Sequence, residues 1–233
     1  MGVVIIVAAL VWAFAPGVGW DLLGLRSRLG WPPQRSGEAL SSLPDGEAAR
    51  QLRALTVRDH DVESETPDYD RGEFGQRWAD TDHNGCDTRN DILARELARP
   101  TYKESTRGCV VLSGTLAAPY TGKTIEFRRG EKTSSLVQID HVVALADAWR
   151  SGSWQWDAGP RQEFANYPDN LLAVDGDANE DKSASAADRW LPPNAAFRCD
   201  YVKRQISVKS RYGLSVTRSE QDAMAQQLST CPG

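Results

Sequence analysis

The residues most able to do chemistry fall in three short elements of the sequence. The run QIDH (138–141) ends an apolar segment, DN (169–170) precedes a second apolar segment, and NEDK (179–182) opens a predicted helix. A strand, a second strand and a helix with polar residues at each junction can converge on one small pocket. We therefore treat the three elements as one candidate site.

Asp140 and Asn179 supply the oxygen atoms that a hard divalent cation prefers. A carboxylate and an amide oxygen suit Mg²⁺ or Mn²⁺, and a site with two protein ligands leaves positions for water and for a phosphate. Such a cation can stabilise charge on a phosphodiester and on its leaving oxygen. The pair therefore indicates a magnesium or manganese site.

His141, Lys182 and Asn170 supply the remaining groups that phosphodiester hydrolysis needs. An imidazole with an ordinary pKa of ≈ 6.5 can take a proton from water, and general-base catalysis contributes ~10²–10⁴-fold. Lys182 lies one helical turn after Asn179 and could meet a phosphate oxygen. Asn170 could hold the loop between the two strands through hydrogen bonds to the backbone.

Each residue also has an ordinary alternative interpretation. An Asp-His pair alone says little, and Asn170 alone is typical of a turn. Asn179 alone is typical of a helix cap, and Lys182 alone of a solvated surface. Only the combination, in this order along the chain, favours a shared site.

The combination resembles the HNH, or ββα-metal, endonuclease superfamily, and more narrowly a subgroup of predicted secreted nucleases. The motifs that carry the resemblance are Asp140-His141, Asp169-Asn170-Leu171 and Asn179-x-x-Lys182. The resemblance extends over residues 74–231, about two thirds of the chain. It also includes Trp78, the run NGCDTR (84–89), Trp149, the run WLPP (190–193), Cys199, Tyr201 and Lys209.

The resemblance implies a role for each matching residue. Asp140 would be a metal ligand, His141 the base that activates water, and Asn170 the residue that shapes the loop. Asn179 stands where many members place a histidine ligand, which favours Mg²⁺ or Mn²⁺ over Zn²⁺. The fold class implied is α+β, a ββα-metal core elaborated with additional helices and short strands.

The net charge of −5 and the sequence pI of about 5.3 require any polyanion to meet a local basic patch. We name Arg89, Lys203 and Lys209 as candidate phosphate contacts. The wider candidate surface is the basic segment 197–218 together with Arg128, Arg129 and Lys132. A solvated helix face is the alternative for that segment.

The four cysteines contain no CxxC pair, which argues against a zinc ribbon. In an exported chain they predict two disulfides, for which three connectivities exist. We favour Cys86–Cys109 and Cys199–Cys231, because each bond would close a loop within its own segment. Free thiols in a cytosolic protein are the alternative.

The start of the chain bears on where the protein acts. Residues 3–15 are an unbroken apolar run, shorter than the ~20 residues of a membrane-spanning helix and typical of a signal peptide. No Lys or Arg precedes the run, and Pro16 follows the Ala13-x-Ala15 motif, so an uncleaved anchor reaching residue 25 and a buried helix stay open. We predict a signal peptide or membrane anchor at 1–25, a linker with a short helix at 26–73 and the nuclease-like domain at 74–233.

The periodicity of apolar residues predicts the elements that must position the site. Strands are predicted at 109–112, 124–127, 136–139 and 171–174. Helices are predicted within 44–57, from a Thr88/Asp91 capping box to Pro100, at 142–149, at 181–190, in part of 195–212, and after a Thr217/Glu220 capping box. Four tryptophans, Trp149, Trp154, Trp156 and Trp190, are interpreted as packing residues rather than base-stacking ones.

Two functions from different classes fit these observations. The first is a secreted, monomeric, metal-dependent endonuclease that cleaves DNA, with RNA as a further substrate. The second is a non-catalytic exported module, tethered by its N-terminus, that binds nucleic acid or a cell surface. No GxSxG or HExxH motif supports another hydrolase.

Overall fold

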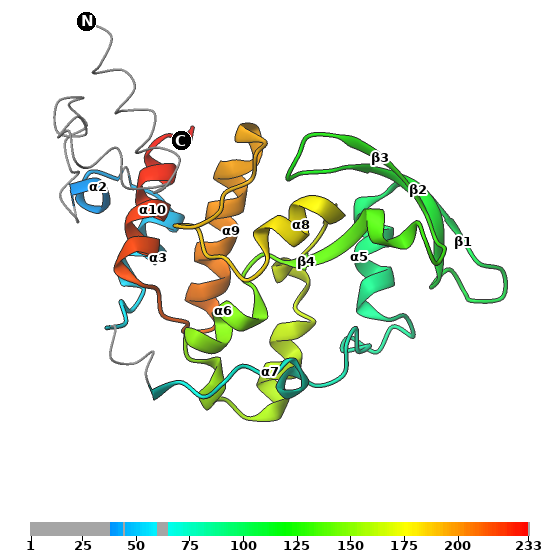
Figure 1. Cartoon of the computed structure of the whole chain (residues 1–233), viewed down its shortest axis with the longest axis horizontal. Coiled ribbons are helices and arrows are strands. Elements are labelled where there is room, and N and C mark those ends of the chain that lie inside the picture. The colour runs from blue at the N-terminus through cyan, green and yellow to red at the C-terminus, as the bar shows by residue number, and fades with distance from the viewer. Residues whose placement is uncertain (1–37, 44, 60–64, 233) are drawn as a thin grey trace, which may run out of the picture. The chain divides into compact units, whose positions relative to one another are not determined.

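The computed structural model of the protein describes residues 38–43, 45–59 and 65–232. These described residues form one compact unit (Figure 1). In the described part of the chain no helix is both long and apolar enough to cross a membrane. The predicted signal peptide or anchor lies outside the described residues. The helices are α2 (Glu38–Ser41), α3 (Glu47–Ala54), α5 (Thr88–Glu96), α6 (Leu145–Arg150), α7 (Ala158–Ala165), α8 (Gly176–Lys182), α9 (Arg198–Arg211) and α10 (Arg218–Ser229).

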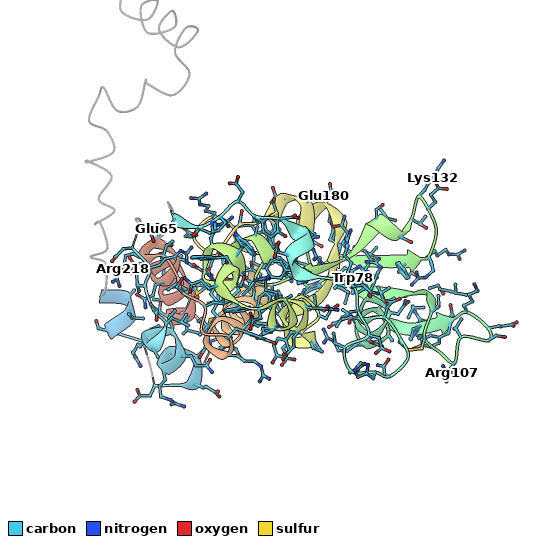
Figure 2. The ribbon with its side chains drawn as sticks, turned by 90° about the horizontal axis from the view of Figure 1, so that it is seen from below. Glu65, Trp78, Arg107, Lys132, Glu180 and Arg218 are labelled. Carbon is cyan, nitrogen blue, oxygen red and sulfur yellow. A yellow bond between two sulfur atoms is a disulfide. The ribbon has the colours of Figure 1, made fainter. Side chains whose placement is uncertain are left out.

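Two small antiparallel sheets accompany these helices. The strands are β1 (Ala98–Tyr102), β2 (Val111–Ala117), β3 (Thr124–Arg128), β4 (Val137–His141) and β5 (Leu171–Asp175). Strands β1, β2 and β3 pair in that order, and β4 pairs with β5. Figure 2 shows Arg107 and Lys132 at the end of the molecule that β1–β3 form. The fold is therefore mixed α+β, as predicted.

Alternation along β4 and β5 separates two hydrophobic clusters. Ile139 lies opposite Ala173, and both belong to a cluster with α5 and the β1–β3 sheet. Leu172 and Val174 point to the other face and belong to a cluster with α9 and α10. Because successive side chains of a strand point to opposite faces, the two-stranded sheet forms a partition between these clusters. All five residues of β5 are buried.

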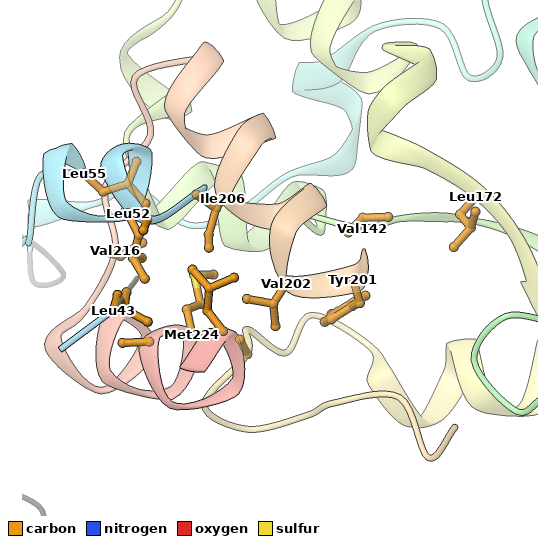
Figure 3. Close-up of a cluster of buried hydrophobic side chains, with 14 of the residues drawn as sticks. Leu43, Leu52, Leu55, Val142, Leu172, Tyr201, Val202, Ile206, Val216 and Met224 are labelled. Atoms are coloured by element: carbon orange, nitrogen blue, oxygen red, sulfur yellow. The ribbon is translucent and has the colours of Figure 1, made fainter. Parts of the chain in front are cut away.

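The second cluster includes the predicted amphipathic helix near residue 50, which the structure confirms as α3. Leu52 of α3 is fully buried and packs with Ile206 of α9 and Met224 of α10 (Figure 3). The compact unit therefore contains α2 and α3 and starts before residue 74, where we expected the domain to begin.

Capping residues set the ends of two helices. The predicted capping box of Thr217 and Glu220 is present at the start of α10. At α5 the prediction of Thr88 as the cap is wrong, because the carboxylate of Asp87 accepts the hydrogen bond from the backbone N–H of Asn90. The Thr88 hydroxyl instead donates to the carbonyl oxygen of Ala79 at 2.5 Å.

The predicted helix over residues 181–190 is wrong. Helix α8 begins earlier, where the carboxylate of Asp175 accepts hydrogen bonds from the backbone N–H groups of Asp177 and Ala178. It ends at Lys182, because Ser183 adopts a left-handed conformation with φ 49°. Residues 183–194 run as turns and extended chain. The NEDK run therefore closes a helix instead of opening one.

Both favoured disulfides are present. Cys86 is bonded to Cys109 and Cys199 to Cys231, with Cα–Cα distances of 5.0 and 5.6 Å. The first bond ties the segment before α5 to the segment before β2, and the second ties the start of α9 to the end of the chain. The four cysteines are therefore structural in this protein.

Candidate active site

Asp140 lies at the end of β4 and is almost fully buried, with 6% of its surface exposed. One carboxylate oxygen accepts a hydrogen bond from the Tyr120 hydroxyl at 2.5 Å, and the other lies 3.0 Å from the Lys182 Nζ. Burial raises the pKa of the Asp140 carboxyl, while the nearby Lys182 ammonium acts in the opposite direction. The carboxylate is thus held rigidly by two partners.

Lys182 is the last residue of α8 and is fully buried, so the predicted contact with a phosphate oxygen is wrong. Besides its ion pair with Asp140, its Nζ donates to the backbone carbonyl oxygen of His141 at 2.9 Å. A buried ammonium needs such partners, because an isolated charge is strongly disfavoured away from water. Lys182 therefore fastens α8 to the end of β4.

Helix α8 can lie against β4 because of a glycine at its start. A side chain at Gly176 would collide with the carbonyl oxygen of Ser135, just before β4. One turn along, the Asn179 side-chain amide donates to Oε1 of Gln138 at 2.7 Å, and Gln138 lies two residues before Asp140 on the same face of β4. Strands β4 and β5 and helix α8 thus form a ββα unit whose helix covers the Asp140 face.

His141 follows Asp140 on β4 and points to the opposite face. Its imidazole lies parallel to the Trp78 indole, with ring centroids 5.9 Å apart and an interplanar angle of 11°. Its Nε2 lies 2.8 Å from the carbonyl oxygen of Ala165. Because a carbonyl oxygen only accepts hydrogen bonds, this contact assigns the proton of a neutral imidazole to Nε2 and leaves Nδ1 with a free lone pair.

The surroundings of His141 favour the neutral imidazole. Burial lowers the pKa of His141 to about 3, against the opposing effect of the Ala165 hydrogen bond. The nearby positive charges of Arg71 and Lys182 lower the pKa further. His141 is therefore unprotonated at neutral pH, the form in which an imidazole can accept a proton.

Asn170 makes the backbone hydrogen bonds expected of it. It is fully buried, and its side-chain amide accepts from the backbone N–H of Val143 at 2.8 Å and donates to the carbonyl oxygen of the same residue at 3.1 Å. Its own carbonyl oxygen accepts from the N–H of Val142 at 2.8 Å. These bonds fix the chain that leaves the C-terminal end of β4.

The residues predicted to contact phosphate do not gather around the site. Lys209 is fully buried between Asp147 and Glu220, at 2.9 and 2.7 Å, so the prediction of an exposed phosphate contact there is wrong. Arg89 donates to the backbone carbonyl of Val137 at 3.1 Å. Lys203 is exposed on α9.

Tyr120 and Trp78 touch the two central residues, and sequence reasoning assigned neither a role. Tyr120 is fully buried in the turn between β2 and β3. Trp78 adopts a left-handed backbone conformation, φ 54°, which is uncommon for a bulky residue. No local pattern marks either residue, because both contacts join segments more than 15 residues apart in the chain.

The tryptophans after β4 pack against the hydrophobic clusters, as predicted. Trp149, on α6, is 5% exposed, and Trp154 and Trp156 pack against the same cluster. Trp190 lies against Tyr120, with ring centroids 5.0 Å apart.

With this geometry in view, comparison with known proteins identifies the family. The structure places the protein in the class of α+β folds that contain a ββα unit. Residues 87–227 match the family described as GmrSD restriction endonucleases, C-terminal domain. The match covers more than half of the chain and includes Asp140, His141, Asn170, Asn179 and Lys182. The chain belongs to this family, and the expected resemblance to an endonuclease family is confirmed.

One curated relative is similar over most of its length. The chain is 35% identical over 193 residues to an uncharacterized secreted protein of Arthroderma benhamiae, covering 82% of this chain and 88% of the relative. No solved structure matches.

Proposed function

We propose that the protein is a metal-dependent endonuclease of the HNH type that hydrolyses phosphodiester bonds in DNA. Membership of a restriction-endonuclease family supports a nuclease role in general. One observation supports the more specific proposal of general-base catalysis by His141. The Ala165 carbonyl orients its ring through Nε2, which leaves the lone pair of Nδ1 available. In this proposal that nitrogen removes a proton from the water that attacks phosphorus.

A free lone pair is not sufficient for catalysis, because a base with a pKa of about 3 is weak. The negative phosphate of a bound substrate would favour the protonated imidazole and so raise the pKa of His141. The Trp78 ring and the Ala165 carbonyl would keep the imidazole in place during the transfer. Substrate binding would therefore activate the base.

The donor set at Asp140 and Asn179 fits a hard cation held through few protein atoms. Asp140 offers a carboxylate at the end of β4 and Asn179 an amide on α8, and a cation there would share the carboxylate with Tyr120 and Lys182 and retain several waters. Within the described residues no three His, Cys, Asp or Glu side chains form a richer metal-binding group. When bound, Mg²⁺ or Mn²⁺ would stabilise charge on the phosphate and on the leaving oxygen.

The Lys182 ammonium already balances part of the negative charge of the Asp140 carboxylate. In our proposal it keeps the carboxylate ionised and aimed, and it shares the carboxylate with the cation. Asn170 holds the backbone after His141 and acts as a positioning residue. Truncation of Lys182 should mainly destabilise the contact between α8 and β4, whereas truncation of His141 should lower kcat.

The relative's name and the two disulfides support export of the protein. Disulfides form and persist in oxidising compartments such as the cell exterior. We therefore propose that the enzyme is secreted, acts as a monomer and meets nucleic acid outside the cell.

A second candidate function has its own supporting observation. Both oxygens of Asp140 are already engaged, by Tyr120 and by Lys182, which is the arrangement expected of a structural carboxylate. A non-catalytic module that binds nucleic acid would keep this arrangement unchanged. The two functions differ in whether the protein cleaves what it binds.

One assay separates the two functions. Purified protein is incubated with duplex DNA, single-stranded DNA and RNA, each with Mg²⁺, with Mn²⁺ and with a chelator. We expect cleavage of duplex DNA that either cation supports and the chelator abolishes, and weaker cleavage after Asp140→Ala or Asn179→Ala. Binding without cleavage under every condition would support the non-catalytic module.

A further inference from the structure

The charges of the chain are distributed unevenly. The chain has a net charge of −5, yet residues 98–133 contain seven Lys and Arg residues and only three Glu residues. This segment, which forms β1, β2, β3 and their connections, therefore has a local charge of +4. The rest of the chain is therefore strongly acidic.

Most cations of this segment face solvent without a protein partner. Lys123 lies 3.9 Å from Asp175, and Arg129 donates to the carbonyl oxygen of Val111 and to Asn90. In the part of the chain that the structure describes, the other five are exposed and form no ion pair. We call these five the basic sheet residues: Arg99, Lys103, Arg107, Arg128 and Lys132.

The sheet that carries these cations is attached firmly to the candidate active site. Phe127 of β3 and Val111 of β2 pack in one cluster with Ile139 of β4. The turn between β2 and β3 supplies Tyr120, which holds the Asp140 carboxylate. The cluster lies on the same face of β4 as His141.

The dimensions of the sheet suit a nucleic-acid duplex. The seven residues of β2 span about 20 Å at ~3.4 Å per residue, roughly the length of six base pairs. Figure 2 shows Arg107 and Lys132 at the end of this sheet, with Trp78 nearer the body of the protein. A duplex whose phosphate reached His141 could therefore continue along the sheet.

We propose that the basic sheet residues bind the phosphate backbone of duplex DNA beside the scissile bond. The inference rests on the proposed function for the identity of the polyanion. Binding at these side chains is independent of sequence, because contacts of Lys and Arg with phosphates carry no direct sequence information. Affinity for DNA then depends steeply on salt, because each phosphate contact releases counterions.

The test uses the full chain with His141→Ala, so that binding is measured without cleavage. Anisotropy of a short fluorescent DNA duplex gives Kd at several salt concentrations, with chelator present. The test variant adds Arg107→Gln and Lys132→Gln. The matched control adds Arg50→Gln and Arg189→Gln, two exposed cations outside the sheet.

The expected result is a slope of log Kd against log salt that falls by about 1.8 in the test variant, at ~0.9 per lost contact, and is unchanged in the control. Equal slopes in the test and control variants would overturn the proposal. Tighter binding to anionic lipid vesicles than to DNA would also overturn it, since Tyr102 and Leu112 are partly exposed on the same sheet.

Failure of this inference is distinguishable from failure of the proposed function. If the intact chain cleaves DNA and the Arg107→Gln/Lys132→Gln variant binds and cleaves it equally well, only the role of the basic sheet residues in DNA binding is contradicted. DNA binding that depends on these charges, without cleavage in the presence of any cation, would support the role of the basic sheet residues and contradict the proposed nuclease function.

Discussion

The Lys182 ammonium and the Asp140 carboxylate form an ion pair at 3.0 Å, with 0% and 7% of their side chains exposed. The pair joins the C-terminal end of α8 to the C-terminal end of β4. In such a buried pair each charge depends on the other, because neither can be solvated alone. The same contact therefore shapes both the fold and the candidate site.

Lys182→Met should destabilise the protein by about 3–5 kcal/mol, because it leaves the Asp140 charge buried without its counterion. The measurement is the free energy of unfolding in urea. Asp140→Asn in the same chain should recover part of the loss. If the double variant were less stable than Lys182→Met alone, the ion pair would not be the source of the effect.

Asn170→Ala should destabilise the protein by about 2–6 kcal/mol, since two backbone groups of Val143 lose their partner, at ~1–3 kcal/mol each. Asn166→Ala is a matched control, because Asn166 is also buried but its amide donates only to Gln162 in the preceding helix. At a temperature where both variants are folded, DNA cleavage should fall only in Asn170→Ala. Equal activities would mean that the clamp on the loop after β4 is not needed.

Alkaline pH should unfold the protein cooperatively. Burial raises the pKa of Tyr120 and of Tyr201 well above the ordinary value of 10. A raised folded-state pKa contributes stability that is present below the unfolded-state pKa and is lost as pH rises above it. Near-ultraviolet absorbance should show these phenols ionising together with loss of helical circular dichroism. Tyr120→Phe should remove one phenolate from that step, and an unchanged amplitude would contradict the burial of Tyr120.

Much of the candidate site could be predicted because its signals are local. Three such signals each occupy only a few consecutive residues. They are the apolar run of β5, the polar residues at the end of β4 and the Thr217/Glu220 capping box. The pairing of the cysteines followed from loop lengths. The backbone hydrogen bonds of Asn170 followed from its place before a strand.

Other features depend on contacts between distant segments. Lys209 belongs to a basic run that predicts a surface, but Asp147 and Glu220 from other helices neutralise it in the interior. The contact of Tyr120 with Asp140 requires the β2–β3 turn to fold over β4. The predicted start of the helix was wrong because Asp175 is both the last residue of β5 and the N-cap of α8, so no loop separates the two elements. Such features need tertiary packing, which residue spacing alone does not express.

The most direct test of the central claim is the rate of plasmid nicking by His141→Gly, with and without added imidazole, in saturating Mg²⁺ or Mn²⁺. We predict a rate lower by ~10²–10⁴-fold than that of the unmodified protein, with KM nearly unchanged and partial rescue by imidazole. A His141→Gly variant that is folded and nicks DNA at the full rate without imidazole would contradict the assignment of His141 as the base.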